Sequence, residues 1–97
     1  MNNFFKEFVH FNFIIERCDM EYSELYVKRI LELCNKKGYS VNKLAKISNV
    51  KQSTLDNIVR GITKNPGVVT LHKLALALNM TFAEFLDFEE MNIYSFD

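Results

Sequence analysis

Glycine and proline are scarce in this sequence, with three glycines and one proline among 97 residues. Hydrophobic residues make up 48% of the chain, which excludes wholesale disorder and leaves enough apolar side chains to form a core. The length suits one domain, because two cores of half this size would each be marginal. The apolar residues recur at helical rather than alternating spacing. The sequence therefore predicts a single all-α domain.

Cysteine is rare as well. Cys18 and Cys34 are too few for a disulfide framework, and such usage is typical of a reducing, cytoplasmic setting. Cys34 lies on an apolar helical stripe, so we expect it to be a small core residue. Together with His10 and His72 the cysteines lack the spacing of a zinc motif, and we therefore expect no metal site.

Several functional signals are also missing. No apolar run reaches the ~18–20 residues needed to span a bilayer. The Phe-rich start is interrupted by Lys6 and Glu7 and lacks the cleavage site of a secretory signal. There is no Gly-rich phosphate loop, no nucleophile elbow and no His/acid set at catalytic spacing. We expect a cytoplasmic protein that is not an enzyme and that needs no cofactor.

The net charge is zero, but the charges are not evenly distributed along the chain. The middle of the sequence is basic and contains the single acid Asp56, whereas no base follows Lys73 and the C-terminal end is acidic. A basic block of this kind favours a polyanionic partner. The block consists of Lys36, Lys37, Lys43, Lys46, Lys51, Arg60 and Lys64, and the acids are Glu84, Asp87, Glu89, Glu90 and Asp97.

Five helices are predicted, and residues that cap or break helices mark their ends. Gly38 and Gly61 supply left-handed exits for the first and third helices. Ser40 and Thr70 are the expected N-caps of the second and fourth helices. A capping box that begins at Thr81 opens the fifth.

The hydrophobic residues of these helices fall on one face of each helix and are predicted to form the core. Asn49 tolerates the left-handed conformation that a tight turn between the second and third helices needs, and Val50 is expected to plug this turn into the core. The stretch Asn65-Pro66-Gly67 is expected to be a loop. The core-facing residues are Val27, Ile30, Leu31, Cys34, Leu44, Ala45, Ile47, Leu55, Ile58, Val59, Leu71, Leu74, Ala75, Leu78, Phe85 and Leu86.

The third helix, expected at about 52–60, has an unusual outer face. It presents Gln52, Ser53, Thr54 and Asn57, which are polar and uncharged, whereas a solvated helix face normally carries Lys and Glu. Side chains that both donate and accept hydrogen bonds are suited to base edges in a major groove. Ala45 is small enough to let this helix pass close to the second helix, expected at about 41–48.

This pattern resembles the phage-repressor/Cro-like (xenobiotic-response-element) helix-turn-helix family. The resemblance covers residues 25–88 and implies a compact, five-helix, lambda-repressor-like DNA-binding domain. It also implies a bacterial or phage transcriptional regulator, a repressor, that binds a palindromic double-stranded operator as a homodimer. The residues that carry it are Leu44-Ala45, Asn49-Val50, Gln52-Ser53-Thr54-Leu55, Ile58, Arg60-Gly61, Asn65-Pro66, Thr70-Leu71, Leu74-Ala75, Ala77-Leu78 and Phe85-Leu86.

The resemblance implies roles for individual residues. Base contacts fall on Gln52, Ser53 and Asn57, with Thr54 close by. The chain departs from the family at Val41, where many members have a phosphate-contacting Gln, and a backbone contact is therefore expected to be missing. Asn49 replaces the usual turn glycine, and Lys51 replaces a common capping serine. Contacts to the DNA backbone are expected from Asn42, Lys43, Lys51, Arg60, Lys64 and Asn65.

The two ends of the chain leave alternatives open. We expect a Phe-rich extension at 1–20, the DNA-binding domain at 21–90 and a tail at 91–97. The extension fits a helix through Phe4, Phe8, Phe11 and Ile15, and fits a strand through Val9, Phe11, Phe13 and Ile15 equally well. Either it is a dimerisation or partner-binding element, or the natural protein starts at Met20, since Glu16-Arg17 can be encoded by a purine-rich ribosome-binding sequence.

An alternative function also follows from the sequence. The chain could be an antitoxin or an anti-repressor whose main partner is another protein, bound through the aromatic termini. A purely protein-binding relative would have lost the polar outer face of the third helix, however, and this chain retains it. The sequence therefore favours DNA-binding regulation.

Overall fold

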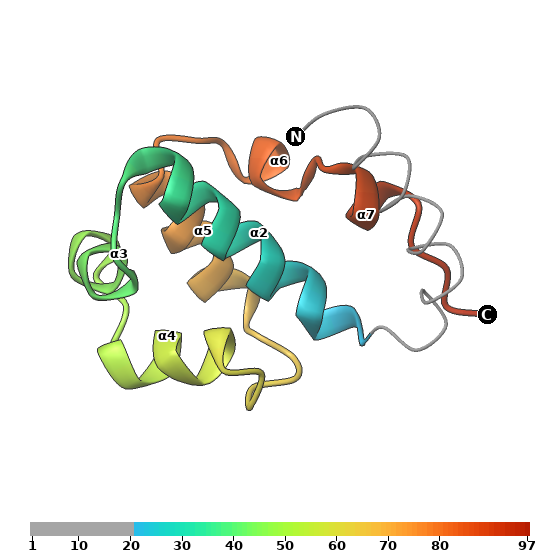
Figure 1. Ribbon diagram of the computed structural model, residues 1–97, viewed down its shortest axis with the longest axis horizontal. Coiled ribbons are helices and arrows are strands. Elements are labelled where there is room, and N and C mark those ends of the chain that lie inside the picture. The colour runs from blue at the N-terminus through green and yellow to red at the C-terminus, as the bar shows by residue number, and fades with distance from the viewer. Residues whose placement is uncertain (1–20) are drawn as a thin grey trace.

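The computed structural model describes residues 21–97, which form six helices and contain no strand (Figure 1). The all-α prediction is thereby confirmed for this range, and none of these helices is long and apolar enough to cross a membrane. The predictions for residues 1–20 lie outside the described range. The helices are α2 (Tyr22–Lys37), α3 (Val41–Ser48), α4 (Gln52–Val59), α5 (Val68–Ala77), α6 (Phe82–Leu86) and α7 (Glu89–Asn92).

Helix α2 crosses the middle of the molecule and contacts both α3 and α4 (Figure 1). It ends as predicted at Gly38, whose φ of 72° is left-handed. Its buried side includes Ile30, Leu33 and Cys34. Leu31 was expected in the core but is 44% exposed. The i, i+4 pattern placed it on the apolar face, but the buried side of α2 runs through Leu25, Ile30, Leu33 and Cys34 and leaves Leu31 at its edge.

The core combines residues from α2 to α6. The four predicted residues of α5 and its C-cap are all buried, and the Phe85 side chain of α6 is completely buried among them. Burial raises the pKa of the Cys34 thiol, which is 3% exposed within this cluster. The core residues from α3 onward are Leu44, Ala45, Val50, Leu55, Ile58, Leu71, Leu74, Ala75, Leu78 and Phe85.

Two further expectations were wrong. Ile47 is 44% exposed, because Leu44 and Ala45 already occupy the contact between α3 and the core. Helix α5 begins at Val68, two residues before the predicted cap at Thr70. Gly67 is extended after the loop and its carbonyl accepts the first helical hydrogen bond, from Leu71 N–H at 3.1 Å, so no side-chain cap is used.

The sixth helix, α7, was not predicted. It is a single turn that begins after the extended residue Phe88 and crosses the expected boundary between domain and tail at residue 90. A four-residue helix is too short for periodicity to reveal. Tertiary contacts hold it instead, because Tyr22 of α2 donates a hydrogen bond to Met91 Sδ at 3.2 Å.

The tail after α7 folds back onto the start of α2. The Tyr22 ring lies 5.1 Å from that of Tyr94 and 5.3 Å from that of Phe96, and the two tail rings lie 5.0 Å apart. Aromatic pairs at these distances are attractive beyond the area that they bury. The tail therefore packs against the start of the chain's own α2.

Arg29 fastens α6 to α2. Its Nε donates to the Phe85 carbonyl at 2.8 Å and its Nη2 to the Glu84 carbonyl at 2.7 Å. The guanidinium carbon also lies 4.9 Å from the centre of the Phe88 ring. A cation beside the last carbonyls of a helix compensates its unsatisfied acceptors and its dipole.

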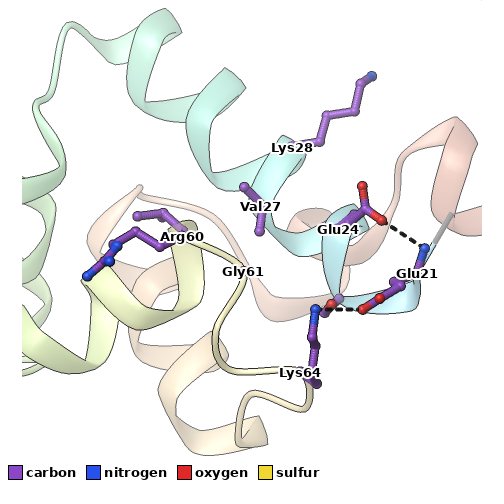
Figure 2. A pocket seen from close by; sticks show the side chains of 9 residues that line it. Glu21, Glu24, Val27, Lys28, Arg60, Gly61 and Lys64 are labelled. Atoms are coloured by element: carbon purple, nitrogen blue, oxygen red, sulfur yellow. Dashed lines mark hydrogen bonds and ion pairs between the residues drawn. The ribbon is translucent and has the colours of Figure 1, made fainter.

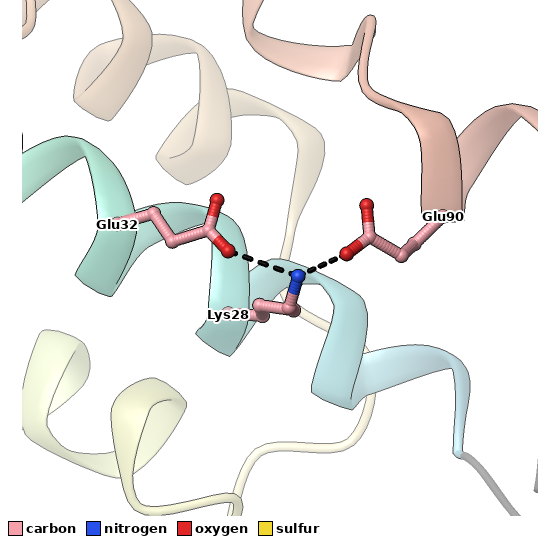
Figure 3. A network of polar contacts seen from close by, with 3 residues as sticks. All are labelled: Lys28, Glu32 and Glu90. Carbon is pink, nitrogen blue, oxygen red and sulfur yellow. Dashed lines mark hydrogen bonds and ion pairs between the residues drawn. The ribbon is translucent and has the colours of Figure 1, made fainter. Parts of the chain in front are cut away.

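Lys28 ties the same side of α2 to α7. Its ammonium lies between Glu32, at 2.9 Å, and Glu90, with which it forms both a hydrogen bond and an ion pair (Figure 3). Burial by itself raises the pKa of Glu90, but the hydrogen bond and the charge of Lys28 outweigh it and hold that pKa below its ordinary value of 4.5. Glu90 at the acidic end of the chain is therefore neutralised by a lysine of α2 that does not belong to the basic block.

The Lys28–Glu90 pair predicts a pH-dependent contribution to stability. A carboxylate whose pKa falls on folding stabilises the folded state above pH 4.5, and this contribution is lost as the pH falls through the lower folded-state pKa. Glu90→Gln should lower the free energy of unfolding at pH 7 by less than about 1 kcal/mol, because the pair is partly exposed. In urea titrations this difference should shrink as the pH falls below 4.5 and disappear below the lower folded-state pKa.

The control is Glu89→Gln. Glu89 is exposed on the same helix and forms no ion pair with any residue in the 21–97 range. Its substitution should leave stability unchanged at both pH values. A difference between Glu90→Gln and wild type that persists unchanged in acid would contradict the assignment of the ion pair.

Candidate nucleic-acid interface

Short-range hydrogen bonds fix the start of α3 and the turn between α3 and α4. Ser40 caps α3 as predicted, with its Oγ accepting from Lys43 N–H at 3.0 Å. Asn49 then takes the left-handed conformation, with a φ of 59°. The Ala45 carbonyl accepts from Val50 N–H at 3.1 Å and from the Ser48 hydroxyl at 3.2 Å. These bonds turn the chain within a few residues and bring α4 against α3.

Helix α4 presents one apolar and one polar side. Leu55 and Ile58 are buried and anchor the helix on the core. The predicted base-contacting residues of its first turn, Gln52, Ser53 and Thr54, are all exposed. The helix thus displays an uncharged polar end, preceded by the exposed Lys51, whose side chain forms no cap, as expected.

Asn57 occupies a different position from the other predicted base-contacting residues. It lies one turn further along α4 and is half-buried. Its carbonyl accepts from the N–H groups of Ile62 at 2.9 Å and Thr63 at 3.0 Å, which fix the chain after the helix. The helix itself ends at Val59, one residue before the predicted end, because Gly61 takes a left-handed φ of 77°.

The Gln52 side chain has a partner within α4. Its Nε2 donates to Asp56 Oδ1 at 2.8 Å, across one helical turn. Asp56 is the only acid in the basic middle of the sequence. The exposed amide at the start of α4 is therefore held by a charge-assisted hydrogen bond before any ligand arrives.

The start of α3 carries two of the predicted backbone contacts. Asn42 and Lys43 are both exposed in its first turn. The Lys43 ammonium lies 4.8 Å from the centre of the Tyr39 ring. A cation over an aromatic face at this distance is attracted by the ring, so Tyr39 restricts where the Lys43 charge can lie.

The remaining predicted contacts lie beyond the end of α4. Arg60 is its C-cap, while Lys64 and Asn65 are exposed in the loop before α5. Arg60 and Lys64 line an open pocket of about 520 Å³ between the end of α4 and the start of α2. Figure 2 shows Lys64 pointing to Glu21, with which it forms an ion pair at 2.8 Å, whereas Arg60 points away from the acids. Lys64 is thus already paired in the free protein.

The structure separates the charges more clearly than the sequence does. Every member of the basic block is exposed, and most of them belong to α3, α4 and the loops that flank these helices. The acids of the C-terminal end lie in α6, α7, the turn between them and the tail, on the opposite side of α2 from α4 (Figure 1), whereas Asp56 and Glu21 lie beside the basic block. A largely positive surface set apart from the C-terminal acids suits a polyanion.

The comparison with known families agrees with this geometry. Residues 30–85, which include all of α3 and α4, match the helix-turn-helix family. The match spans more than half of the chain. The chain belongs to the helix-turn-helix family. Within that family, α3 and α4 are the two helices of the motif, and the turn at Asn49 joins them.

The chain is similar in sequence to two transcriptional regulators of Bacillus subtilis. The chain is 42% identical over 66 residues to the HTH-type transcriptional regulator SlrR of Bacillus subtilis (strain 168), covering 67% of this chain and 43% of that protein. It is 33% identical over 60 residues to the regulator SinR of the same organism, covering 62% of this chain and 54% of that protein. The chain thus spans about half the length of these relatives.

A solved structure has the same fold. The crystal structure of the prophage Lp1 protein 11 superposes with a TM-score of 0.69 at 26% identity. The alignment covers 75% of this chain and 97% of that one. The helical arrangement in Figure 1 is therefore shared over nearly the whole of the prophage protein.

Three residues of the helix-turn-helix surface were missed by sequence reasoning. Asp56 holds Gln52, Tyr39 lies beneath Lys43, and Glu21 pairs with Lys64. Each of the first two contacts joins residues four positions apart. Because Gln52 and Asp56 lie in one helix, their i, i+4 spacing could have revealed the first contact. Nothing in the sequence brings Glu21 to Lys64, because that contact depends on how α2 packs against α4.

The left-handed Asn49 leads to a stability prediction. Asn49→Ala should lower the free energy of unfolding by about 1 kcal/mol, since a Cβ without a polar group is strained in this conformation. Asn49→Gly should stay within about 0.5 kcal/mol of wild type, since glycine adopts it freely. Urea titration followed by circular dichroism measures both changes.

The matched control is Asn79, which has a φ of 63° outside the motif. Asn79→Ala should produce a loss of similar size if the cost comes from backbone conformation. An Asn49→Ala protein as stable as wild type would show that the turn does not depend on a residue suited to the left-handed region.

Proposed function

We propose that this chain binds double-stranded DNA sequence-specifically through α3 and α4 and acts as a transcriptional regulator, a repressor. The observation that carries the proposal is the exposed, uncharged polar first turn of α4, formed by Gln52, Ser53 and Thr54. Such side chains suit base edges, and an α-helix of this kind fits the major groove. The names of the Bacillus relatives support the same function.

The surrounding residues suit contacts to phosphate. Asn42 and Lys43 lie at the start of α3, Lys51 at the start of α4, and Arg60, Lys64 and Asn65 beyond its end. Residues at both ends of α4 could therefore contact the DNA backbone while the helix reads bases between them. In this proposal Asn57, half-buried further along α4, contacts a base at the edge of the interface.

The proposal extends to assembly and location. A single α4 covers only a short half-site, so we propose a homodimer on a palindromic operator with half-sites about one helical turn apart. DNA as the partner places the protein in the cytoplasm. As regulators of this kind perform no chemistry on their ligand, the proposal includes no catalytic activity.

The alternative of an antitoxin or anti-repressor has less support among the described residues. It relied on aromatic termini that are available to a protein partner. Tyr94 and Phe96 instead pack with Tyr22, although Phe96 remains 82% exposed. Protein capture is therefore an outcome that the experiment below distinguishes from DNA binding.

Fluorescence anisotropy with duplex from the region upstream of the protein's own gene tests the proposal. Wild type should prefer this duplex over a scrambled one, and its affinity should fall steeply as salt is raised. Gln52→Ala should weaken binding to the upstream duplex by about 1–3 kcal/mol while leaving the salt slope unchanged, because it removes base contacts and no phosphate contact.

The matched control is Asn92→Ala. Asn92 is an exposed amide on α7, on the opposite side of α2 from α4 (Figure 1), and its loss should leave DNA affinity unchanged. Absence of binding to any duplex at low salt would overturn the proposal and direct the search to a protein partner. Equal affinity for upstream and scrambled duplex across a set of candidate operators would reject sequence-specific regulation.

A further inference from the structure

We propose that Asp56 is a specificity-determining residue, which positions the Gln52 amide to select adenine over guanine at the base pair that Gln52 reads. The inference rests on the DNA-binding function proposed above. It starts from the hydrogen bond from Gln52 Nε2 to Asp56 Oδ1, 2.8 Å long, in the free protein. Asp56 itself was not among the residues predicted to touch DNA.

The hydrogen bond fixes which way round the amide lies. A carboxylate can only accept hydrogen bonds, so the NH₂ group of Gln52 must face Asp56 and the carbonyl oxygen must face away. An amide rotated by 180° would set two acceptors against each other. Asp56 therefore gives a defined donor–acceptor order to a side chain that would otherwise present either end to the groove.

The same hydrogen bond changes how many donors remain. A free Gln amide has two N–H donors and one acceptor oxygen. With one N–H committed to Asp56, the amide offers one donor and one acceptor. Adenine presents an acceptor at N7 and a donor at N6, which match this pair, whereas guanine presents two acceptors at N7 and O6. At guanine, the O6 acceptor would face the Gln52 oxygen, which is also an acceptor. Because one Gln52 N–H is already bonded to Asp56, Gln52 cannot donate both N–H groups to guanine instead.

The position of Asp56 is also compatible with this supporting role. It lies one turn behind Gln52 on α4 and is half-buried, whereas Gln52, Ser53 and Thr54 are exposed. Its charge opposes the phosphate backbone, and it is the only acid within the basic middle of the chain. The negative charge of Asp56 lowers the affinity for every DNA sequence. In this proposal, the base selectivity that Asp56 gives to Gln52 offsets that lower affinity.

Two other roles for Asp56 lead to different measurements. Asp56 could read a base itself by accepting from cytosine N4, in which case its removal would change discrimination at a neighbouring base pair. It could also serve only to stabilise α4, since Gln–Asp pairs at i, i+4 support isolated helices. In that case its removal would change stability and leave base preference intact.

The test uses the full chain and operator duplexes in which each base pair is replaced in turn. The pair read by Gln52 is the one whose discrimination is lost in Gln52→Ala. There wild type should prefer adenine over guanine by roughly five- to 150-fold, the range for one good bidentate contact. In Asp56→Ala this preference should fall to within about threefold, while the affinity for scrambled duplex rises because a negative charge is removed.

Two variants separate positioning from charge. Asp56→Asn removes the charge and can donate to Gln52 as well as accept from it, so it no longer fixes one orientation of the amide and should lose most of the adenine preference. Glu21→Gln removes a different acid, the partner of Lys64, and does not touch Gln52. It should raise affinity for all duplexes alike and leave the adenine preference unchanged.

An NMR measurement on the free protein reports the hydrogen bond without DNA. The side-chain NH₂ signals of Gln52 should shift in Asp56→Ala and not in Glu21→Gln. An unchanged adenine preference in Asp56→Ala would overturn the inference alone, as would a change confined to a neighbouring base pair. If wild type binds no duplex with sequence preference, the proposed function fails and the inference fails with it.

Discussion

The close approach of α3 and α4 depends on Ala45. Its side chain is a single methyl group, 3% exposed, so the two helices can meet there without a gap or a clash. Its carbonyl also accepts the hydrogen bonds of Val50 and Ser48 that close the turn. A larger side chain would push α4 outward and with it the first turn that carries Gln52. The placement of the first turn of α4 relative to α3 therefore depends on one small residue, Ala45, and on the left-handed Asn49 four places after it.

Helix α2 has a second organising role, because it separates opposite charges. On one side it supports α4 and the basic loops, and on the other its own Lys28 and Arg29 fasten the acidic end of the chain. Lys28 pairs with Glu90 of α7 and Arg29 donates to the last carbonyls of α6, so both short helices are held on the side of α2 away from α4. A neutral chain can in this way present a positive surface without any excess of basic residues.

Prediction from sequence succeeded where a feature is set by neighbouring residues. The left-handed residues Gly38 and Asn49, the Ser40 cap and the buried side of α5 all follow from local rules of spacing and backbone conformation. It failed where packing decides. The exposure of Leu31 and Ile47 and the single turn of α7 depend on which faces the other helices cover, and the early start of α5 depends on the extended Gly67 after the loop.

The candidate site shows the same division. The exposure of Gln52, Ser53 and Thr54 was accessible from the apolar spacing of α4, because Leu55 and Ile58 must face inward. The partners of the polar side chains were not foreseen. Contacts such as that of Glu21 with Lys64 join residues far apart in the chain, and long flexible side chains have no spacing rule that foretells them.

The reactivity of the buried Cys34 thiol can report opening of the core. The thiolate is the form that reacts with alkylating reagents, and burial both shields the sulfur and raises its pKa. The residue packs in the cluster that holds Leu44 and Ala45 of α3, so a reagent reaches it when that cluster separates. The rate at which the peptide containing Cys34 becomes labelled thus reports how much of the time this cluster is open. Any ligand that binds only the closed arrangement must slow that rate in proportion to its occupancy.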